Sequence, residues 1–228
     1  MSKWIDFTID ERKAMIQAVS DEKQIDEASA EKDWWVTAVL YVIFHTSIGE
    51  HLLFKGGTSL SKGWNIINRF SEDIDLALSR DFFLNVKNLA CANCTSNTQI
   101  HHFLEKAFLL CEEYQKAEPR THRMTRHFYD LEKLMQTPYA EVALNDVALY
   151  EDIVNHRRKF YHVGYVDYDK ELPQSIQIVP SDALLPSYEA DYNEMRGSFI
   201  YGESLDFSAL MKRMAELQER FRKISNEL

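Results

Sequence analysis

Two short motifs hold the side chains best suited to phosphate chemistry. They are a glycine turn and, fourteen residues after its end, a pair of aspartates: Gly56, Gly57, Thr58 and Ser59, then Asp73 and Asp75. A glycine turn at the beginning of a helix offers unpaired backbone N–H groups and a favourable dipole to a phosphate. Two carboxylates on one face of a strand suit Mg²⁺, which prefers hard oxygen ligands together with phosphate oxygens. Each motif alone is usually an ordinary turn or a solvated strand edge, but together they predict a site for a nucleoside triphosphate and Mg²⁺.

The hydrophobic pattern around these motifs predicts the elements that must position them. Residues 51–55 form a short apolar run that indicates a strand, and helical spacing resumes over residues 58–64, after the glycines. Residues 73–78 alternate acidic with apolar side chains, which is the period-two pattern of a strand with one polar face. We therefore expect a strand, a glycine turn, a helix and a second strand in succession, with Asp73 and Asp75 on one face.

Helical spacing dominates the rest of the chain. The expected helices lie at residues 9–19, 29–43, 103–115, 125–135, 146–161, 188–196 and 207–224. Trp34 and Trp35 belong to the second of these helices and are expected in the core. Residues 85–102 lack periodicity and are expected to form a loop. The predicted fold class is α/β (α+β): residues 1–102 hold the N-terminal helices and a small mixed β-sheet, and residues 103–228 form a mostly helical C-terminal domain.

The composition restricts the class of protein. The chain has 228 residues, a formal charge of −10, 45% hydrophobic residues and few glycines and prolines, which excludes disordered and collagen-like proteins. An acidic chain is not a general coat for duplex nucleic acid, although a local basic site is compatible with this charge. The sequence shows no secretory signal and no apolar run of the roughly 20 residues that a membrane span needs. With three cysteines, an odd number, we expect reduced thiols and a cytoplasmic protein.

Four segments of the chain resemble those of one known family. They are residues 54–62, with the glycine turn, residues 69–76, with the aspartates, residues 103–107 (Phe-Leu-Glu-Lys-Ala) and residues 126–131 (Arg-His-Phe-Tyr-Asp-Leu). These segments are similar to the signature of the AbiEii/AbiGii toxin family. That family belongs to the nucleotidyltransferase superfamily with the DNA polymerase beta-like fold, and it includes the MenT-type toxins. Residues 191–195 and 199–202 also resemble its helical C-terminal part.

This resemblance implies a role for each matched residue. The triphosphate would be bound by Gly56, Gly57, Thr58, Ser59, Lys62 and Ser71, Mg²⁺ would be ligated by Asp73 and Asp75, and the catalytic set would be completed by Lys106 and Asp130. The implied reaction is transfer of a nucleoside monophosphate from a nucleoside triphosphate to an acceptor hydroxyl, with metal ions and a lysine compensating the charge on the phosphates. The implied biological role is the toxin of a toxin–antitoxin or abortive phage infection system, with tRNA as a candidate acceptor and a cognate antitoxin as a candidate partner.

The chain departs from the family pattern in one place. Only thirty residues separate Asp75 from Lys106, where members of the family usually have several more strands, and no third metal-binding carboxylate is evident. A second interpretation therefore stays open, in which the protein is a catalytically silent module that binds a nucleotide or a partner. A third interpretation is a metal-dependent phosphotransferase that modifies a protein side chain.

Two further groups of residues have an ordinary and a functional interpretation. Cys91 and Cys94 with His101 and His102 resemble half of a zinc site, but a structural zinc needs four ligands, and ordinary reduced thiols are the alternative. The basic side chains within residues 120–126 and 156–159 suit either a solvated face or the phosphates of an RNA acceptor.

Overall fold

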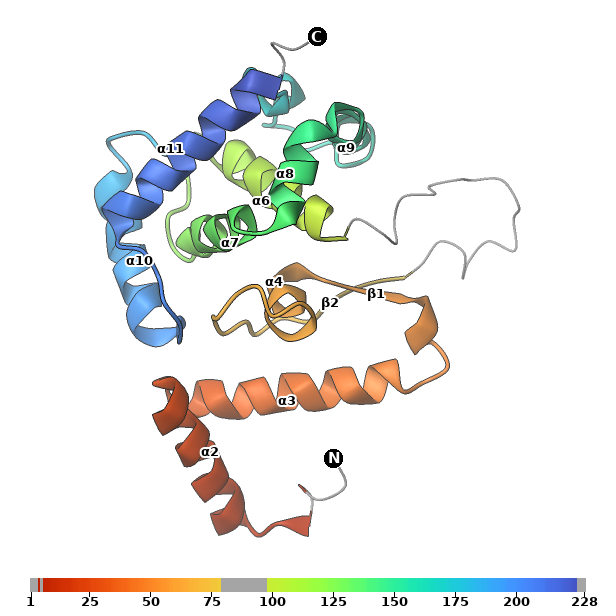
Figure 1. Cartoon of the computed structure of the whole chain (residues 1–228), viewed down its shortest axis with the longest axis vertical. Helices are drawn as coiled ribbons and strands as arrows, with labels where there is room; N and C mark the ends of the chain where they lie inside the picture. The colour runs from red at the N-terminus through yellow and green to blue at the C-terminus, as the bar shows by residue number, and fades with distance from the viewer. Residues whose placement is uncertain (1–3, 5, 79–97, 225–228) are drawn as a thin grey trace. The chain divides into compact units, whose positions relative to one another are not determined.

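The computed structural model describes residues 4, 6–78 and 98–224, and the chain forms two compact units (Figure 1). The first unit comprises Met1–Asn93 and Arg196–Glu203, and the second comprises Cys94–Met195 and Ser204–Leu228. Within the described residues the structure is mainly helical and has one two-stranded sheet. This confirms the predicted fold class, a small sheet combined with a mostly helical remainder.

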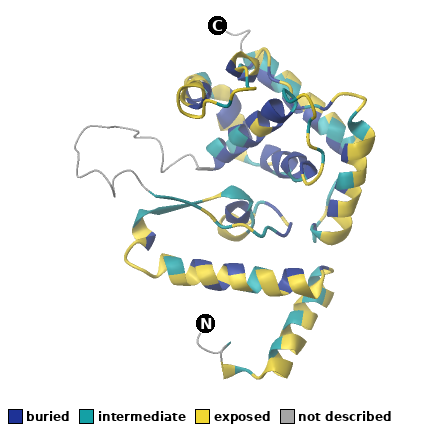
Figure 2. Cartoon of the chain, turned by 180° about the vertical axis from the view of Figure 1, so that it is seen from behind, coloured by how far each residue is buried: buried dark blue, intermediate teal, exposed yellow. Residues whose placement is uncertain are grey.

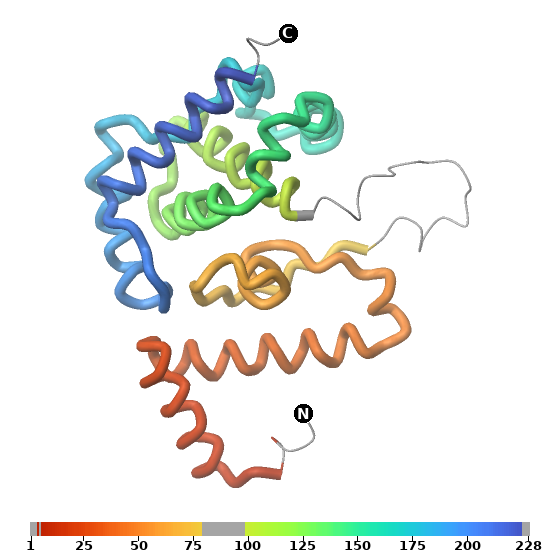
Figure 3. The backbone as a smooth tube through the Cα atoms, in the orientation of Figure 1, coloured from red at the N-terminus to blue at the C-terminus, as the bar shows by residue number. Residues whose placement is uncertain are grey.

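The first unit begins with two helices, α2 (Ile9–Lys23) and α3 (Glu27–Phe44). Thr8 and Glu11 form a capping box at the beginning of α2, and the carboxylate of Asp26 accepts a hydrogen bond from the Ser29 backbone N–H (2.9 Å) at the beginning of α3. The chain turns sharply between the two helices (Figure 3). Both expected helices are therefore present, with longer bounds than the sequence predicted.

The prediction that both tryptophans of α3 belong to the core is wrong for Trp35. This side chain is 52% exposed, whereas Trp34 is half-buried and stacks on Trp4 with ring centroids 4.3 Å apart. Val39 and Val42 are exposed on the same helix. Helix α3 is apolar on most of its surface, and a helical pattern alone does not tell which side packs.

The sheet of the first unit pairs β1 (Leu52–Lys55) with β2 (Asp75–Leu78) in antiparallel fashion. A short helical segment follows β1 directly, first α4 (Gly56–Thr58) and then the π-helical turn η2 (Ser59–Gly63), while the 3-10 turn η1 (Gly49–His51) precedes it. The predicted order of strand, turn, helix and strand is confirmed. However, β2 begins at Asp75, so Asp73 lies two residues before the strand rather than in it.

A segment from much later in the sequence completes the first unit. The backbone N–H of Phe70 donates to the carbonyl of Phe199 (2.8 Å), and that of Tyr201 donates to the carbonyl of Asn68 (3.0 Å). Arg69 and Ile200 form an isolated antiparallel bridge. Residues 196–203 therefore hold the strand-like stretch that leads from η2 to the aspartates.

The second unit is helical among its described residues. Its elements are α6 (Thr98–Glu113), α7 (Thr125–Met135), α8 (Pro138–Asn145), α9 (Val147–Phe160), η3 (Tyr168–Glu171), α10 (Leu185–Ser198), which continues into the first unit, and α11 (Phe207–Ile224). Residues 98–102, expected in a loop, instead begin α6, and α8 is a separate helix that the sequence analysis missed. Residues 85–97 of the expected loop, with Cys91 and Cys94, lie outside the described part of the chain.

Aromatic side chains fill the core of this second unit. Figure 2 shows α6 and α7 as mostly buried helices. Phe221 of α11 packs against Phe103 of α6 and Tyr150 of α9, with ring centroids 5.8 Å and 5.9 Å apart, and all three are fully buried. Three helices distant in sequence thus share one core. None of the described helices is long and apolar enough to cross a membrane.

Candidate functional site

The glycine turn of the first unit is shaped around a carboxylate. Gly56 has φ +75°, in the left-handed region that favours glycine, and a Cβ added there would lie 1.8 Å from Oδ2 of Asp75. Lys55 and Asp75 are paired across the two strands, which brings Asp75 beside the turn. Only glycine at position 56 allows this carboxylate to lie against the backbone.

The second glycine of the turn faces a guanidinium and a hydroxyl. A Cβ at Gly57 would lie 2.6 Å from Nη2 of Arg69 and 3.1 Å from Oγ of Ser71. Arg69 is only 6% exposed, and its Nη1 donates to the Phe70 carbonyl (3.1 Å). Arg69 lies within the segment that carries the family resemblance, but its type and spacing alone predict no role for it. Its spacing of two residues from Ser71 is only a weak indication that both side chains share a face. The fold shows that both lie beside Gly57.

The two hydroxyl groups of the turn donate hydrogen bonds to nearby backbone carbonyls. Thr58 Oγ1 donates to the backbone carbonyl of Asp73, and Ser59 Oγ donates to the carbonyl of Gly56 (2.9 Å). Both side chains are fully buried. These bonds join the turn to the aspartate segment, so Thr58 and Ser59 support the shape of the site from within.

Lys62 is directed to the preceding helix. Its Nζ lies 2.8 Å from Oδ1 of Asp33 on α3, and the two side chains are 22% and 24% exposed. An ion pair of this kind ties η2 to α3. Lys62 therefore lies in the same unit as the glycine turn and is paired with the Asp33 carboxylate.

The two aspartates offer oxygen ligands to solvent. Asp73 and Asp75 are both exposed, and the Thr58 hydrogen bond fixes the backbone at Asp73. The described residues contain no group of three or more His, Cys, Asp or Glu side chains suited to a metal. Mg²⁺ is usually held by one or two carboxylates together with substrate phosphates and water. The pair therefore fits a magnesium ion that arrives with a triphosphate.

Lys106 and Asp130 meet inside the second unit. Lys106 Nζ on α6 lies 2.6 Å from Oδ2 of Asp130 on α7, and the two side chains are 9% and 0% exposed. Taking both charges out of water costs free energy that the pairing offsets only when its geometry is good. The structure thus brings together the two residues that the sequence implied only by resemblance. All other predicted site residues belong to the first unit.

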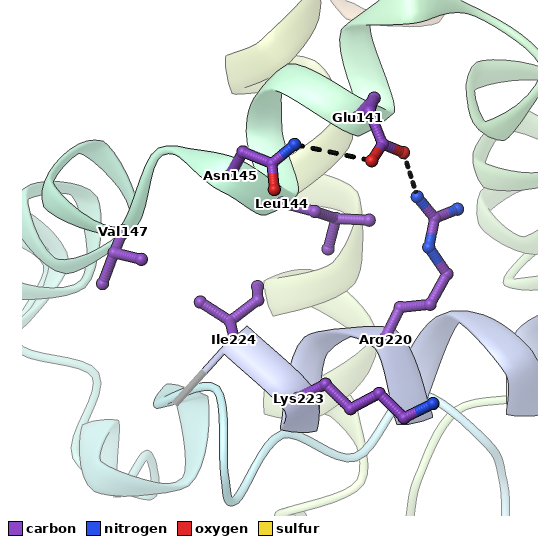
Figure 4. A pocket seen from close by; sticks show the side chains of 7 residues that line it. All are labelled: Glu141, Leu144, Asn145, Val147, Arg220, Lys223 and Ile224. Atoms are coloured by element: carbon purple, nitrogen blue, oxygen red, sulfur yellow. Dashed lines mark hydrogen bonds and ion pairs between the residues drawn. The ribbon is translucent and has the colours of Figure 1, made fainter. Parts of the chain in front are cut away.

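A hollow between α8 and α11 of the second unit is a weaker candidate (Figure 4). It has a volume of about 330 Å³, and its only carboxylate, Glu141, is bound by Arg220 (2.6 Å) and Asn145 (3.4 Å). None of the predicted site residues lines it. The Glu141 carboxylate is already paired, and Lys223 is the remaining charged side chain of the lining, so among the described residues the hollow offers no acid and base in combination.

The two basic clusters are largely offset by carboxylates. Arg157 is buried against Glu105 and Glu112, and Arg158 pairs with Asp169 (2.6 Å). In the other cluster, the Arg120 side chain lies 3.8 Å from Glu113. The idea that residues 156–159 form one exposed basic face is wrong for Arg157, because its charge is used in the core.

Comparison with known proteins identifies a family. The family described as nucleotidyl transferase AbiEii toxin, type IV TA system, matches residues 38–108 and 100–213, which together make up most of the chain. The matched ranges include the glycine turn, both aspartates, Lys106 and Asp130. No curated protein and no solved structure matches the chain.

Proposed function

Because this chain belongs to the AbiEii nucleotidyl transferase toxin family of type IV toxin–antitoxin systems, we propose that it transfers a nucleoside monophosphate to an acceptor hydroxyl. The acceptor oxygen forms a bond to the α-phosphorus of a nucleoside triphosphate, the bond to the β-phosphate oxygen breaks, and pyrophosphate leaves with its charge. The hydroxyl proton passes to a base or to solvent. The observation that carries the proposal is the glycine turn packed against Asp75, Arg69 and Ser71.

In this proposal the first unit binds the triphosphate. The backbone N–H groups of Gly56 and Gly57 would bind the phosphates, with Arg69 and Ser71 beside the same turn. Asp73 and Asp75 would hold Mg²⁺, which supplies positive charge to the phosphate oxygens when it is bound. Thr58 and Ser59 act indirectly, since their hydroxyls hold the turn in shape.

We further propose that Lys106 compensates charge on the triphosphate and that Asp130 orients it. Asp130 is fully buried and its carboxylate is bound to the Lys106 ammonium, so orienting Lys106 suits it better than accepting a proton from the acceptor. In the reaction, a fixed ammonium costs no reorganisation as charge develops on the leaving pyrophosphate. The ion pair supports this assignment.

Transfer from labelled triphosphates tests the reaction. The purified protein is incubated with each α-³²P triphosphate, Mg²⁺ and total RNA, and we expect labelled RNA. Asp75→Ala should reduce labelling at least about 100-fold, because the carboxylate helps to hold the charge-compensating metal ion. Asp75 is exposed, so this change should leave the fold intact.

Glu72→Ala is the matched control. It removes a neighbouring carboxylate whose partner is Lys32 of α3 (3.4 Å), and it should change labelling less than about threefold. Equal losses in Asp75→Ala and Glu72→Ala, or no labelled product from the wild type with any triphosphate, would contradict the proposed reaction.

Two other functions remain separable by experiment. The described residues offer two carboxylates at the turn rather than three, which favours a silent nucleotide-binding module as the second candidate. Calorimetry that detects triphosphate binding without turnover on RNA or protein would support that module. Transfer of γ-label, and not of α-label, to a protein would instead indicate a phosphotransferase.

We propose tRNA as the acceptor, the cytoplasm as the place of action and a cognate antitoxin as the partner that limits toxicity. Expression of the chain should arrest growth, and Asp75→Ala should relieve the arrest if nucleotidyl transfer is the cause. Labelled species of tRNA length on a denaturing gel would identify the acceptor class. Arrest that persists in Asp75→Ala would separate toxicity from transfer.

A further inference from the structure

A buried arginine in the second unit faces three acidic side chains. Arg157 of α9 is 1% exposed, and each nitrogen of its guanidinium faces a different partner. Nη1 donates to Glu105, Nη2 donates to Glu112, and Nε lies 3.2 Å from Oε2 of Glu171 in η3. Only a planar guanidinium presents donors in three fixed directions, so a lysine could not reproduce this arrangement.

Burial and charge in this cluster act in opposite directions. Burial lowers the pKa of the Arg157 guanidinium, but the carboxylates of Glu105, Glu171 and Glu112 together raise it by more, so arginine stays charged. Burial raises the pKa of Glu171 to about 8, with Arg157 lowering it in part and Glu112 raising it further. The cluster therefore sets one buried cation against three acidic side chains, of which Glu171 has a raised pKa.

The cluster binds Arg157 to α6, the helix that carries Lys106. Glu105 and Glu112 are seven residues apart on α6, so they lie on one face, two turns from each other. Lys106 follows Glu105 directly and points to Asp130 of α7. Two contacts two turns apart constrain the rotation and the axial position of α6, in addition to its buried apolar packing.

We propose that Arg157 is a positioning residue for Lys106, because its bonds to Glu105 and Glu112 set the rotation of α6 and thus the place of the Lys106 ammonium. The catalytic consequence rests on the proposed function, but the positioning itself does not. Stability alone gives little reason for the cluster, since well-packed neutral side chains in place of buried ion pairs are often as stable or more so. A fixed direction for Lys106 is what the cluster adds.

Neutralising the whole cluster separates positioning from stability. Arg157→Met alone would leave the three acidic side chains without their cation and is expected to unfold the unit. The test variant therefore combines Arg157→Met with Glu105→Gln, Glu112→Gln and Glu171→Gln, and its thermal unfolding should be at least as cooperative as that of the wild type. Arg158→Met is the matched control, because Arg158 lies next along α9 and pairs with an exposed carboxylate, Asp169.

The first readout is the position of Lys106, measured without any substrate. In protein carrying ¹³C-labelled lysine, the Cε signal of Lys106 is assigned by its absence from Lys106→Arg. We expect this signal to shift or broaden in the neutral variant and to stay unchanged in Arg158→Met. A signal that stays at its wild-type position in the folded neutral variant would overturn the proposal. Should that variant not fold, Arg157→Lys decides by the same criterion.

The second readout is catalysis. With the neutral variant folded, kcat for labelled transfer should fall about 10- to 100-fold while the KM for the triphosphate changes much less, since misplacement of a reacting group by about 1 Å costs this much. Wild-type kcat in the neutral variant would also overturn the proposal. The two proposals can fail separately. If the wild type transfers no nucleotide but the Lys106 signal still shifts in the neutral variant, the positioning role stands and the proposed function is wrong.

Discussion

At the scale of single residues, Gly56 lies directly against the carboxylate of Asp75. The left-handed backbone of Gly56 and the carboxylate beside it occupy space that any Cβ would need. Gly57 has the same relation to Arg69 and Ser71, though without a positive φ. Glycine is therefore required at position 56 by both backbone conformation and space. At position 57 it is required by space alone.

Gly56→Ala should be costly for both stability and activity. We expect a loss of about 2 kcal/mol in the free energy of unfolding, because alanine is strained at this φ, and displacement of Asp75 by the new methyl group. Urea unfolding followed by tryptophan fluorescence measures the first effect, and labelled transfer measures the second.

Gly63→Ala is the control for this change, since its Cβ would come no closer than 3.7 Å to Phe54. We expect a change of less than about 1 kcal/mol there. Equal destabilisation in Gly56→Ala and Gly63→Ala would show that the close approach of Asp75 to the turn is wrong.

At the scale of elements, η3 is held to the second unit by charge and hydrogen bonding. The Tyr150 hydroxyl of α9 donates a hydrogen bond to the backbone carbonyl of Glu171, and the Glu171 carboxyl packs beside Arg157 and Glu112. The carboxyl of Glu171 is fully buried. The protonation of the Glu171 side chain therefore bears on how this 3-10 turn is held against α9.

Glu171 should make the second unit less stable as the pH rises. Below pH 4.5 the carboxyl is protonated in both states, and its contribution to stability is fully present. Between 4.5 and about 8 the unfolded chain releases the proton while the folded chain keeps it, so stability falls until the folded pKa is passed. Glu171→Gln should reduce this loss by about 2 kcal/mol between about pH 5 and 7.5, measured by urea unfolding followed by circular dichroism.

Asp169→Asn tests whether the effect belongs to Glu171 rather than to η3 in general. Asp169 lies on the same turn, but its side chain is 72% exposed, and its partner is the exposed Arg158. We expect a wild-type pH profile for Asp169→Asn. A Glu171→Gln profile as steep as that of the wild type would mean that Glu171 is already ionised at neutral pH.

At the scale of the whole molecule, the two units have separate cores and different reporters. All four tryptophans, Trp4, Trp34, Trp35 and Trp64, belong to the first unit. The second unit contains most of the described helix and a core in which Phe221 joins α11 to α6 and α9. Tryptophan fluorescence therefore reports on the first unit, whereas circular dichroism weights the second.

Phe221→Ala should destabilise the second unit selectively. Removing this fully buried ring should cost about 3–5 kcal/mol and move the circular dichroism transition to lower urea, while the fluorescence transition changes little. Phe160→Ala, at a phenylalanine that is 58% exposed, should move neither transition by much. Coincident shifts of both transitions in Phe221→Ala would show that the two units unfold as one.

Local patterns allowed the sequence to predict much of this architecture. The alternation near the aspartates, the glycines after an apolar run and the helical spacing of the later segments each depend on residues close together in the chain. These patterns identified both strands, the glycine turn and most helices. The boundaries failed where local signals conflict, as at residues 98–102, whose polar composition resembles a loop although the tertiary core stabilises them as helix.

The sequence by itself determined which residue types are available for phosphate and metal chemistry, because the glycine turn and the aspartates are local motifs. Only the tertiary structure decided how the charges are used. It buried Arg157 among three acidic side chains, directed Lys62 to Asp33 and brought Arg69 against Gly57. Whether a charged side chain is solvated or paired depends on partners that lie far away in sequence. No local pattern predicts which partners the fold will bring together.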